Sequence, residues 1–491
     1  MNRQIRRVAI TMGILMAALL VNLNYVQVVK SDAYRNNKNN KRVILNEYAN
    51  PRGSIIVQGT PIAESVATKD ELKYLRKYPD GPTYADLTGW YSLVYDKNGL
   101  EETEDGLLSG SDSRLLGTRI TDLLTGRTPK GGSVSLTINK AAQEKAYAGL
   151  GGRRGAVVAL DPRTGAILAA VSSPSYDPSV LSSHNLDAIQ AAWKRLNADK
   201  DQPLLPRAFQ ATYPPGSVFK VVVAAAALKA GKKPDDVIPG PTVLPLPDGG
   251  TMHNFANESC SRNGKTTTLI AALTISCNTA FAQLGIDTGQ DAVQSEANLF
   301  GMNDQDFSVP LSVSGSTMGT IENRSQLGQS SIGQFNVQMT PLQAAMISAA
   351  VENNGTLMQP YLVQQELAPN LSVLDTTQPK QQSQVLPPDL DRQLQQMMEN
   401  VVSKGTGTLA QIDNERVGGK TGTADNADAK GNPLPPHAWF TGYAADPVHP
   451  IAVAVVLENA GVTGNESAGG EKAAPLARDV MKAYLADMSG R

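Results

Sequence analysis

The spacing of apolar and polar positions divides the chain into a membrane-like start and two folded parts. Residues 8–29 carry no charge and 8–21 are almost wholly apolar, so this run is long enough to cross a bilayer as one helix. Residues 43–130 then alternate short apolar runs with turn residues, a pattern typical of short strands. The sequence therefore predicts one transmembrane helix followed by a small, mainly β module.

From about residue 133 the pattern is that of a mixed protein with strands and helices. Strands are expected at 133–138, 155–162 and 166–171, and a helix is expected at 140–150. The turn Pro162-Arg-Thr-Gly165 joins the second and third of these strands into a pair. This part of the chain therefore opens with strands.

The last part of the chain also contains strands, and helices lie between the two strand regions. Thr340-Pro-Leu-Gln343 combines an N-cap, a proline in the first turn and a glutamine three residues on, so it opens a helix over 342–351. Strands are expected at 437–443 and 451–457, and an amphipathic helix at 474–488. The pattern predicts an α/β fold of the α+β type, in which one five-stranded, mainly antiparallel sheet carries a helical subdomain.

Two polar segments mark the expected domain boundaries. Residues 36–42 (NNKNNKR) form a polar stalk, and 125–132 (TGRTPKGG) form a linker. The predicted organisation is a cytoplasmic tail and anchor over 1–30, an N-terminal pedestal module over 31–132 and a third domain over 133–491.

Charges around the apolar run predict its orientation. Arg3, Arg6 and Arg7 precede it, and only Lys30 follows closely, so the positive-inside rule keeps the N-terminus in the cytoplasm. The alternative is a cleaved signal peptide, but 21–27 (VNLNYVQ) lacks a small-x-small cleavage pair. We therefore expect a single-pass plasma-membrane protein whose folded parts lie outside the cytoplasm.

Composition limits the functional classes that need to be considered. The 491 residues are 41% hydrophobic and 18% charged with a net charge of −2, which suits two or more domains and gives no sign of nucleic-acid binding. No cysteine–histidine cluster suggests a metal, and no cofactor is expected. Cys260 and Cys277 are the only cysteines, and they either form a disulfide outside the membrane or remain two buried thiols.

Ser217-Val-Phe-Lys220 places a hydroxyl nucleophile and an amine base one helical turn apart. Residues 214–216 (PPG) form a turn that cannot lie inside a helix, so a helix should begin near Ser217. Residues three apart share a helix face, which brings the Lys220 amine towards the Ser217 hydroxyl. Taken alone, Ser217 is equally well explained as an ordinary helix cap.

Two further motifs follow in the chain. Ser276-Cys277-Asn278 follows an apolar run, and Lys420-Thr421-Gly422-Thr423 lies in a glycine-rich segment. Separately, these are common polar residues at a helix turn and a lysine on an edge strand. Three accidents in one order are improbable, and the set resembles the serine penicillin-recognising enzymes, whose motifs are Ser-x-x-Lys, Ser-x-Asn and Lys-Thr-Gly.

The resemblance extends to one group within this family. Asn50-Pro-Arg-Gly-Ser-Ile55 is similar to the segment that opens the dimerisation-like pedestal module of class B penicillin-binding proteins, although Val57-Gln58 departs from the family's Asp-Arg. Arg207-Ala208 and His437-Ala-Trp-Phe440 look like the penicillin-binding protein A type of actinobacteria. The resemblance covers about 135–485 and implies the penicillin-binding transpeptidase fold.

The resemblance also implies roles for individual residues. Ser217 would be the nucleophile, Lys220 its base and Ser276 a proton relay, while Lys420 would bind the substrate's terminal carboxylate. The backbone N–H groups of Ser217 and Thr423 would form the oxyanion hole. The implied catalytic residues are Ser217, Lys220, Ser276 and Lys420, and the implied substrate-binding residues are Asn278, Thr421, Gly422 and Thr423.

The implied function is a peptidoglycan D,D-transpeptidase that cross-links stem peptides through a serine acyl-enzyme and is acylated by β-lactams. Its expected partners are D-Ala-D-Ala donors, amine acceptors, the membrane and proteins of a cell-wall synthesis or division complex. About 100 residues before the linker are too few for the glycosyltransferase of a bifunctional enzyme. A serine β-lactamase, a D,D-carboxypeptidase and a non-catalytic sensor remain as alternatives.

Overall fold

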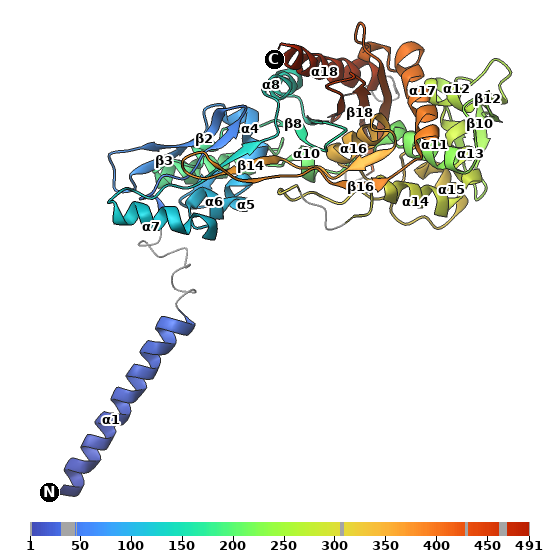
Figure 1. Ribbon diagram of the computed structural model, residues 1–491. Helices are drawn as coiled ribbons and strands as arrows, with labels where there is room; N and C mark the ends of the chain where they lie inside the picture. Colours follow the sequence, from blue (N-terminus) through green and yellow to red (C-terminus); the bar gives the residue numbers. More distant parts are fainter. Residues whose placement is uncertain are drawn as a thin grey trace.

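The computed structural model describes residues 2–30, 45, 47–304, 309–427, 431–460 and 469–490. The polar stalk predicted at 36–42 lies outside these residues. Helix α1 (Asn2–Asn24) continues into a π-helical turn, η1 (Tyr25–Val29), and lies apart from the folded body (Figure 1). Together, α1 and η1 contain a candidate membrane span, Arg3–Val29, with a mean hydropathy of 1.8.

A five-stranded sheet forms the centre of the larger part of the body, as the sequence predicted. Its strand order is β17-β18-β19-β7-β8, and every neighbouring pair is antiparallel. Strand β19 pairs with β7, so the end of the chain closes onto the start of this part. The strands are β7 (Gly155–Leu160), β8 (Ile167–Ser173), β17 (Val417–Ala427), β18 (Pro433–Ala444) and β19 (Ile451–Leu457).

Helices cover both faces of this sheet. Alternate residues of a strand point to opposite faces, and Val157 packs in one hydrophobic cluster with α8 (Lys140–Leu150) and α18 (Ala474–Ser489). Its neighbour Val158 packs in another cluster with helices of the subdomain. Because neither face meets water, the strands read as continuous apolar runs in the sequence.

The helical subdomain lies beyond the second face of the sheet (Figure 1). Its helix α16 (Pro341–Glu352) begins as predicted, since Thr340 Oγ1 accepts a hydrogen bond from the Gln343 N–H at 3.1 Å. Helices that lie between β8 and β17 in the chain also include α9 (Leu186–Ala198), α10 (Arg207–Gln210), η4 (Gly216–Phe219), α11 (Lys220–Lys229), α12 (Leu269–Thr274), α13 (Asn278–Thr288), α14 (Gln290–Leu299), α15 (Arg324–Ser330) and α17 (Pro388–Lys404).

A second sheet belongs to the smaller part of the body, and its strands come from three regions of the chain. Its order is β15-β14-β6-β1-β2-β3. The strand expected at 133–138 is present as β6, but it pairs with β1 and β14 and not with the five-stranded sheet. Because β6 follows residue 132 in the chain but belongs to this second sheet, the domain boundary at 132/133 stays a prediction. The strands are β1 (Ile55–Val57), β2 (Thr60–Ala67), β3 (Tyr74–Lys77), β6 (Ser133–Leu136), β14 (Val363–Leu367) and β15 (Val373–Thr376).

The smaller part also contains helices that the alternating pattern did not predict. They are α4 (Gly81–Thr88), α5 (Leu100–Thr103), α6 (Asp105–Ser109) and α7 (Leu116–Leu124). Most are short and lack the repeated apolar spacing by which a helix is recognised in a sequence.

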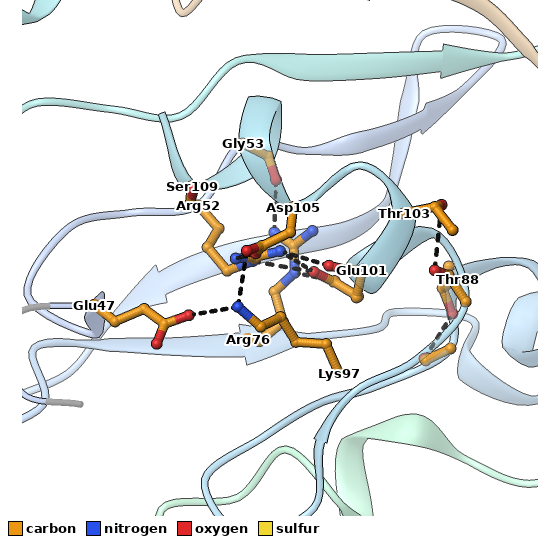
Figure 2. A network of polar contacts seen from close by, with 12 residues as sticks. Glu47, Arg52, Gly53, Arg76, Thr88, Lys97, Glu101, Thr103, Asp105 and Ser109 are labelled. Atoms are coloured by element: carbon orange, nitrogen blue, oxygen red, sulfur yellow. Dashed lines mark hydrogen bonds and ion pairs between the residues drawn. The ribbon is translucent and has the colours of Figure 1, made fainter. Parts of the chain in front are cut away.

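A buried ion network ties these helices to the second sheet (Figure 2). The Arg52 guanidinium contacts the Glu101 carboxylate at 3.0 Å and the Asp105 carboxylate at 2.6 Å, and Arg76 Nε donates to Glu101 at 2.6 Å. Burial opposes ionisation of Glu101, but Arg76 and Arg52 outweigh it and hold the pKa of this carboxyl below its usual value. The Arg-Gly segment noted in the sequence thus organises this part from its interior.

Candidate active site

Ser217 lies in the 3₁₀ turn η4, which runs directly into α11. The helix predicted near Ser217 is therefore present, and its α-helical part begins at Lys220. Gly216 has a φ of +53°, and a Cβ atom there would lie 2.5 Å from the carbonyl oxygen of Thr423. Only glycine fits, because it tolerates this conformation and adds no side chain. The turn that carries Ser217 is thereby held against β17.

Two buried lysine amines converge on one serine hydroxyl. Lys420 Nζ donates to Ser276 Oγ at 2.8 Å, and Lys220 Nζ lies 3.4 Å from the same oxygen. The Lys220 amine also donates to the Ser276 carbonyl oxygen and to Asn278 Oδ1, each at 2.7 Å. Both lysine side chains are fully buried. Ser276 thus bridges the first and third motifs of the sequence.

The Ser276 turn connects α12 to α13 in an unusual backbone conformation. Ser276 has a φ of +63°, which a non-glycine residue adopts only where its surroundings hold it there. The neighbouring Cys277 is bonded to Cys260, and its Sγ accepts from the Ala280 N–H at 3.3 Å at the start of α13. The disulfide and the helix start together hold the turn that carries Ser276 and Asn278.

The third motif forms the part of β17 nearest the serine turn. Thr421 Oγ1 lies 2.6 Å from the Thr406 hydroxyl. At Gly422 a Cβ atom would lie 2.8 Å from the Pro215 carbonyl oxygen and 3.0 Å from Val218, so a larger residue would push the strand away from Ser217. The glycine therefore permits the close approach of β17 to η4.

These elements surround a cleft with a volume of about 320 Å³. Six of the residues singled out in the sequence line it, namely Ser217, Cys260, Ser276, Cys277, Thr421 and Thr423. The cleft also has lining residues that no motif identified, because they come from loops and helix ends without a shared spacing. They include Asn254, Phe255, Glu258, Thr406 and Glu471.

A carboxylate network lies behind the serine turn. Glu458 Oε1 accepts from Tyr213 Oη and from Arg207 Nε, each at 2.8 Å, and Arg154 contacts Oε2 at 2.7 Å. Burial opposes ionisation of Glu458, but Arg207, Tyr213 and Arg154 outweigh it and hold its pKa below the usual value. The sequence drew attention to Arg207 by resemblance only, and it gave no sign of Glu458.

Two of the histidines, His437 and His184, have structural contacts. Burial lowers the pKa of His437, which favours the neutral ring, and its Nδ1 accepts from the Asn459 N–H at 3.3 Å. His184 Nδ1 lies 2.7 Å from the Asp70 carboxylate and does not line the cleft. Among the residues that the structure describes, no group of three or more His, Cys, Asp or Glu side chains is arranged to hold a metal.

The sheet, the serine at the head of a buried helix and the two lysines around Ser276 place the chain among the penicillin-recognising serine enzymes. Residues 155–482 match the penicillin binding protein transpeptidase domain, and residues 52–134 match the penicillin binding protein A dimerisation domain. The chain therefore belongs to the penicillin-binding protein transpeptidase family, as its motifs predicted.

Similar proteins cover most or all of the chain. Peptidoglycan D,D-transpeptidase PbpA of Mycolicibacterium smegmatis is 42% identical over 100% of both chains. The ceftriaxone acyl-enzyme of penicillin-binding protein A from M. tuberculosis superimposes with a TM-score of 0.86 at 42% identity, over 90% of this chain and 100% of that one. Peptidoglycan D,D-transpeptidase MrdA of Haemophilus influenzae is 31% identical over 84% of this chain and 69% of its own length.

Proposed function

We propose that this protein is a membrane-anchored peptidoglycan D,D-transpeptidase whose nucleophile is Ser217. The observation that carries the proposal is the pair of buried lysine amines on Ser276 Oγ, next to a cleft that Ser217 also lines. Two ammonium groups sharing one hydroxyl in a buried site repel each other, so one neutral amine is favoured there. A neutral Lys220 is the base that a serine nucleophile requires.

In the acylation step, Ser217 Oγ attacks the carbonyl carbon between the two D-alanines of a stem peptide. The new Oγ–C bond replaces the C–N bond of the terminal D-alanine. The hydroxyl proton moves to Lys220 and, through Ser276, reaches the departing amine. The backbone N–H groups of Ser217 and Thr423 stabilise the oxyanion, and the Lys420 charge and Thr421 hydroxyl favour the substrate carboxylate.

In the second step, an amine of a neighbouring strand attacks the ester carbon. Its N–C bond replaces the bond to Ser217 Oγ, and the amine proton returns to Ser217 by the same route. Asn278, whose Oδ1 is held by Lys220, leaves its amide nitrogen to a substrate carbonyl or to the His253 carbonyl, which lies at 3.3 Å. The product is a peptide cross-link.

The anchor places this chemistry at the outer face of the cytoplasmic membrane. The span Arg3–Val29 is long and apolar enough to cross a bilayer, and its basic residues lie at its N-terminal end. The N-terminus is then cytoplasmic, and the cleft faces the nascent wall. Proteins of a cell-wall synthesis or division complex are the partners that this position suits.

Covalent labelling with a fluorescent penicillin tests the nucleophile. The wild-type chain should be labelled with a stoichiometry near one, and Ser217→Ala should remain unlabelled. Ser259→Ala is a matched control, because Ser259 lines the same cleft but belongs to no motif. Labelling of Ser217→Ala equal to that of the wild type would disprove the assignment.

The lifetime of the penicilloyl-enzyme separates the alternatives. Persistence for many minutes fits a transpeptidase, whereas hydrolysis within seconds indicates a β-lactamase. Incubation with a stem pentapeptide and an amine acceptor should release D-alanine and form an amide dimer. Release without a dimer would identify a carboxypeptidase, and the absence of both would identify a sensor.

A further inference from the structure

Helix α7 of the smaller part carries an apolar stripe that nothing in the described chain covers. Leu116, Ile120 and Leu124 are 56%, 49% and 84% exposed. They are four residues apart, so at 3.6 residues per turn they occupy an arc of about 80° on one side of the helix. Thr118 lies on the opposite side. Three large exposed side chains in one stripe mark a surface that meets an apolar partner.

Basic residues surround this stripe. Arg119 lies within α7 beside the stripe, and Arg127 and Lys130 follow the helix, all of them exposed. The acidic Asp122 is the only opposing charge between 116 and 130. A helix with a leucine-rich face and flanking basic residues is typical of elements that lie in the headgroup region of an anionic bilayer.

The position of α7 in the molecule brings it within reach of a membrane. Fourteen residues, 31–44, separate the end of the described span at Lys30 from Leu45. At full extension they reach about 50 Å, so the smaller part stays close to the bilayer that α1 crosses. In Figure 1 α7 lies along the side of the body nearest α1.

We propose that α7 docks on the membrane that carries the anchor, with Leu116, Ile120 and Leu124 inserted among the headgroups and Arg119 at the phosphates. The proposal rests on the membrane anchoring proposed above. An interfacial helix of this kind buries its apolar face about 5–10 Å below the headgroup surface. Together with α1 it gives the body two attachments to the bilayer, which restricts how the body is oriented above it.

A single introduced cysteine reports whether α7 enters the bilayer. The two native cysteines are bonded to each other, so a thiol introduced by Leu124→Cys is the one that reacts with a dye. The full-length chain is reconstituted into phosphatidylcholine–phosphatidylglycerol vesicles that contain spin-labelled lipid. The dye at 124 should lose most of its fluorescence, whereas a dye introduced by Thr118→Cys on the opposite side should keep it.

Each outcome bears on one of the two proposals. Failure of the chain to float with the vesicles would refute the anchor and, with it, the docking. Flotation with an unquenched dye at both positions would overturn the docking alone. A change in the fluorescence of the dye at 124 that depends on protein concentration, and that persists in detergent without spin-labelled lipid, would show that a second copy of the chain covers the stripe. That result would also overturn the docking.

A charge-introducing variant completes the test. Ile120→Asp combined with Leu124→Asp should leave penicillin labelling in detergent unchanged, because α7 contributes no residue to the cleft. Limited proteolysis of the 116–130 segment in vesicles should become faster than in the wild type. Equal protection of both chains in vesicles would contradict the proposal.

Discussion

Single side chains behind the serine turn determine where Ser217 stands. Tyr213 Oη donates to Glu458, the Trp439 indole donates to the Pro214 carbonyl oxygen at 3.1 Å, and the two rings are 5.9 Å apart. The backbone of Tyr213 also exchanges two hydrogen bonds with Met339. The residues that lead into Ser217 are thus held by contacts on three sides.

We expect Tyr213→Phe to slow acylation more than it lowers stability. The hydroxyl donates to the charged Glu458 carboxylate, so its removal loses about 1–2 kcal/mol of interaction energy. If the turn shifts as a result, this energy is added to the acylation barrier, and the labelling rate should fall roughly tenfold. Stopped-flow labelling and thermal unfolding in detergent measure the two effects. Tyr443→Phe is the control, because its hydroxyl bonds the Gln395 carbonyl at 3.5 Å on a strand position away from η4. Equal effects in the two variants would argue against the view that the Tyr213 hydroxyl positions Ser217.

Because of Asp391, we expect the folding stability of the protein to depend on pH in an unusual way. Burial raises its pKa to about 8, with Glu352 adding to the shift, so the folded protein holds this proton more tightly than the unfolded chain. Between pH about 4 and about 8 the unfolded chain loses the proton first, and the stability therefore falls as the pH rises.

Asp391→Asn should remove this loss of folding stability at high pH. We expect the variant to exceed the wild type in unfolding free energy at pH 8–9 by roughly 1–3 kcal/mol, and to differ little at pH 5. Urea unfolding of both proteins at each pH measures this difference in unfolding free energy. The neighbouring Asp389→Asn is the control, because Asp389 is exposed on the same helix. A wild type that gains stability from pH 5 to pH 8 relative to Asp391→Asn would contradict the assignment.

At the scale of elements, the Cys260–Cys277 bond joins the segment before α12 to the N-cap residue of α13. It closes a loop with a separation of 17 residues. In the chain-entropy model such a loop stabilises the fold by about 3 kcal/mol. Both cysteines line the cleft, so the same bond also shapes one wall of the site.

Thiol counting tests this element directly. The denatured, unreduced protein should show no titratable thiol, and two thiols would reject the bridge. Reduction should slow penicillin acylation while leaving Ser217 reactive, because the Ser276 turn loses one of its supports. Cys260→Ser with Cys277→Ser should reproduce the rate of the reduced protein and be insensitive to reductant.

At the scale of the whole molecule, the six-stranded sheet joins the two parts of the body. Strands β14 and β15 leave the larger part of the chain and pair beside β6, which in turn pairs with β1. Breaking the ion network around Glu101 should therefore destabilise both parts together.

Glu101→Gln removes the carboxylate that the buried Arg76 contacts and leaves Arg52 with the Asp105 carboxylate, at a cost of about 3–5 kcal/mol. Calorimetry should show one unfolding transition at a lower temperature. The lowered pKa of Glu101 means that the wild type loses this stabilisation as the pH falls, so the gap between the two proteins should narrow in acid. Glu102→Gln, exposed on the same helix, should change little. Two separate transitions, of which only the first shifts, would show that the parts unfold independently.

The sequence by itself determined much of this protein, wherever a local pattern carries the information. Apolar runs bounded by turn residues located the central strands, a helix was expected at 140–150, and the cap at Thr340 located the start of α16. Three motifs identified the family, because the chemistry requires those residue types at those places. The apolar start of the chain predicted its candidate span.

The tertiary structure alone decided how distant segments combine. Local spacing contains no information on strand pairing, so the partner of β6 and the return of β14 were not predictable. The convergence of Lys220 and Lys420 on Ser276 joins residues that are 56 and 144 positions from this serine in the chain. Buried polar groups such as Glu458 and Glu101 have no periodic signal, because each is placed by the partners that folding brings to it.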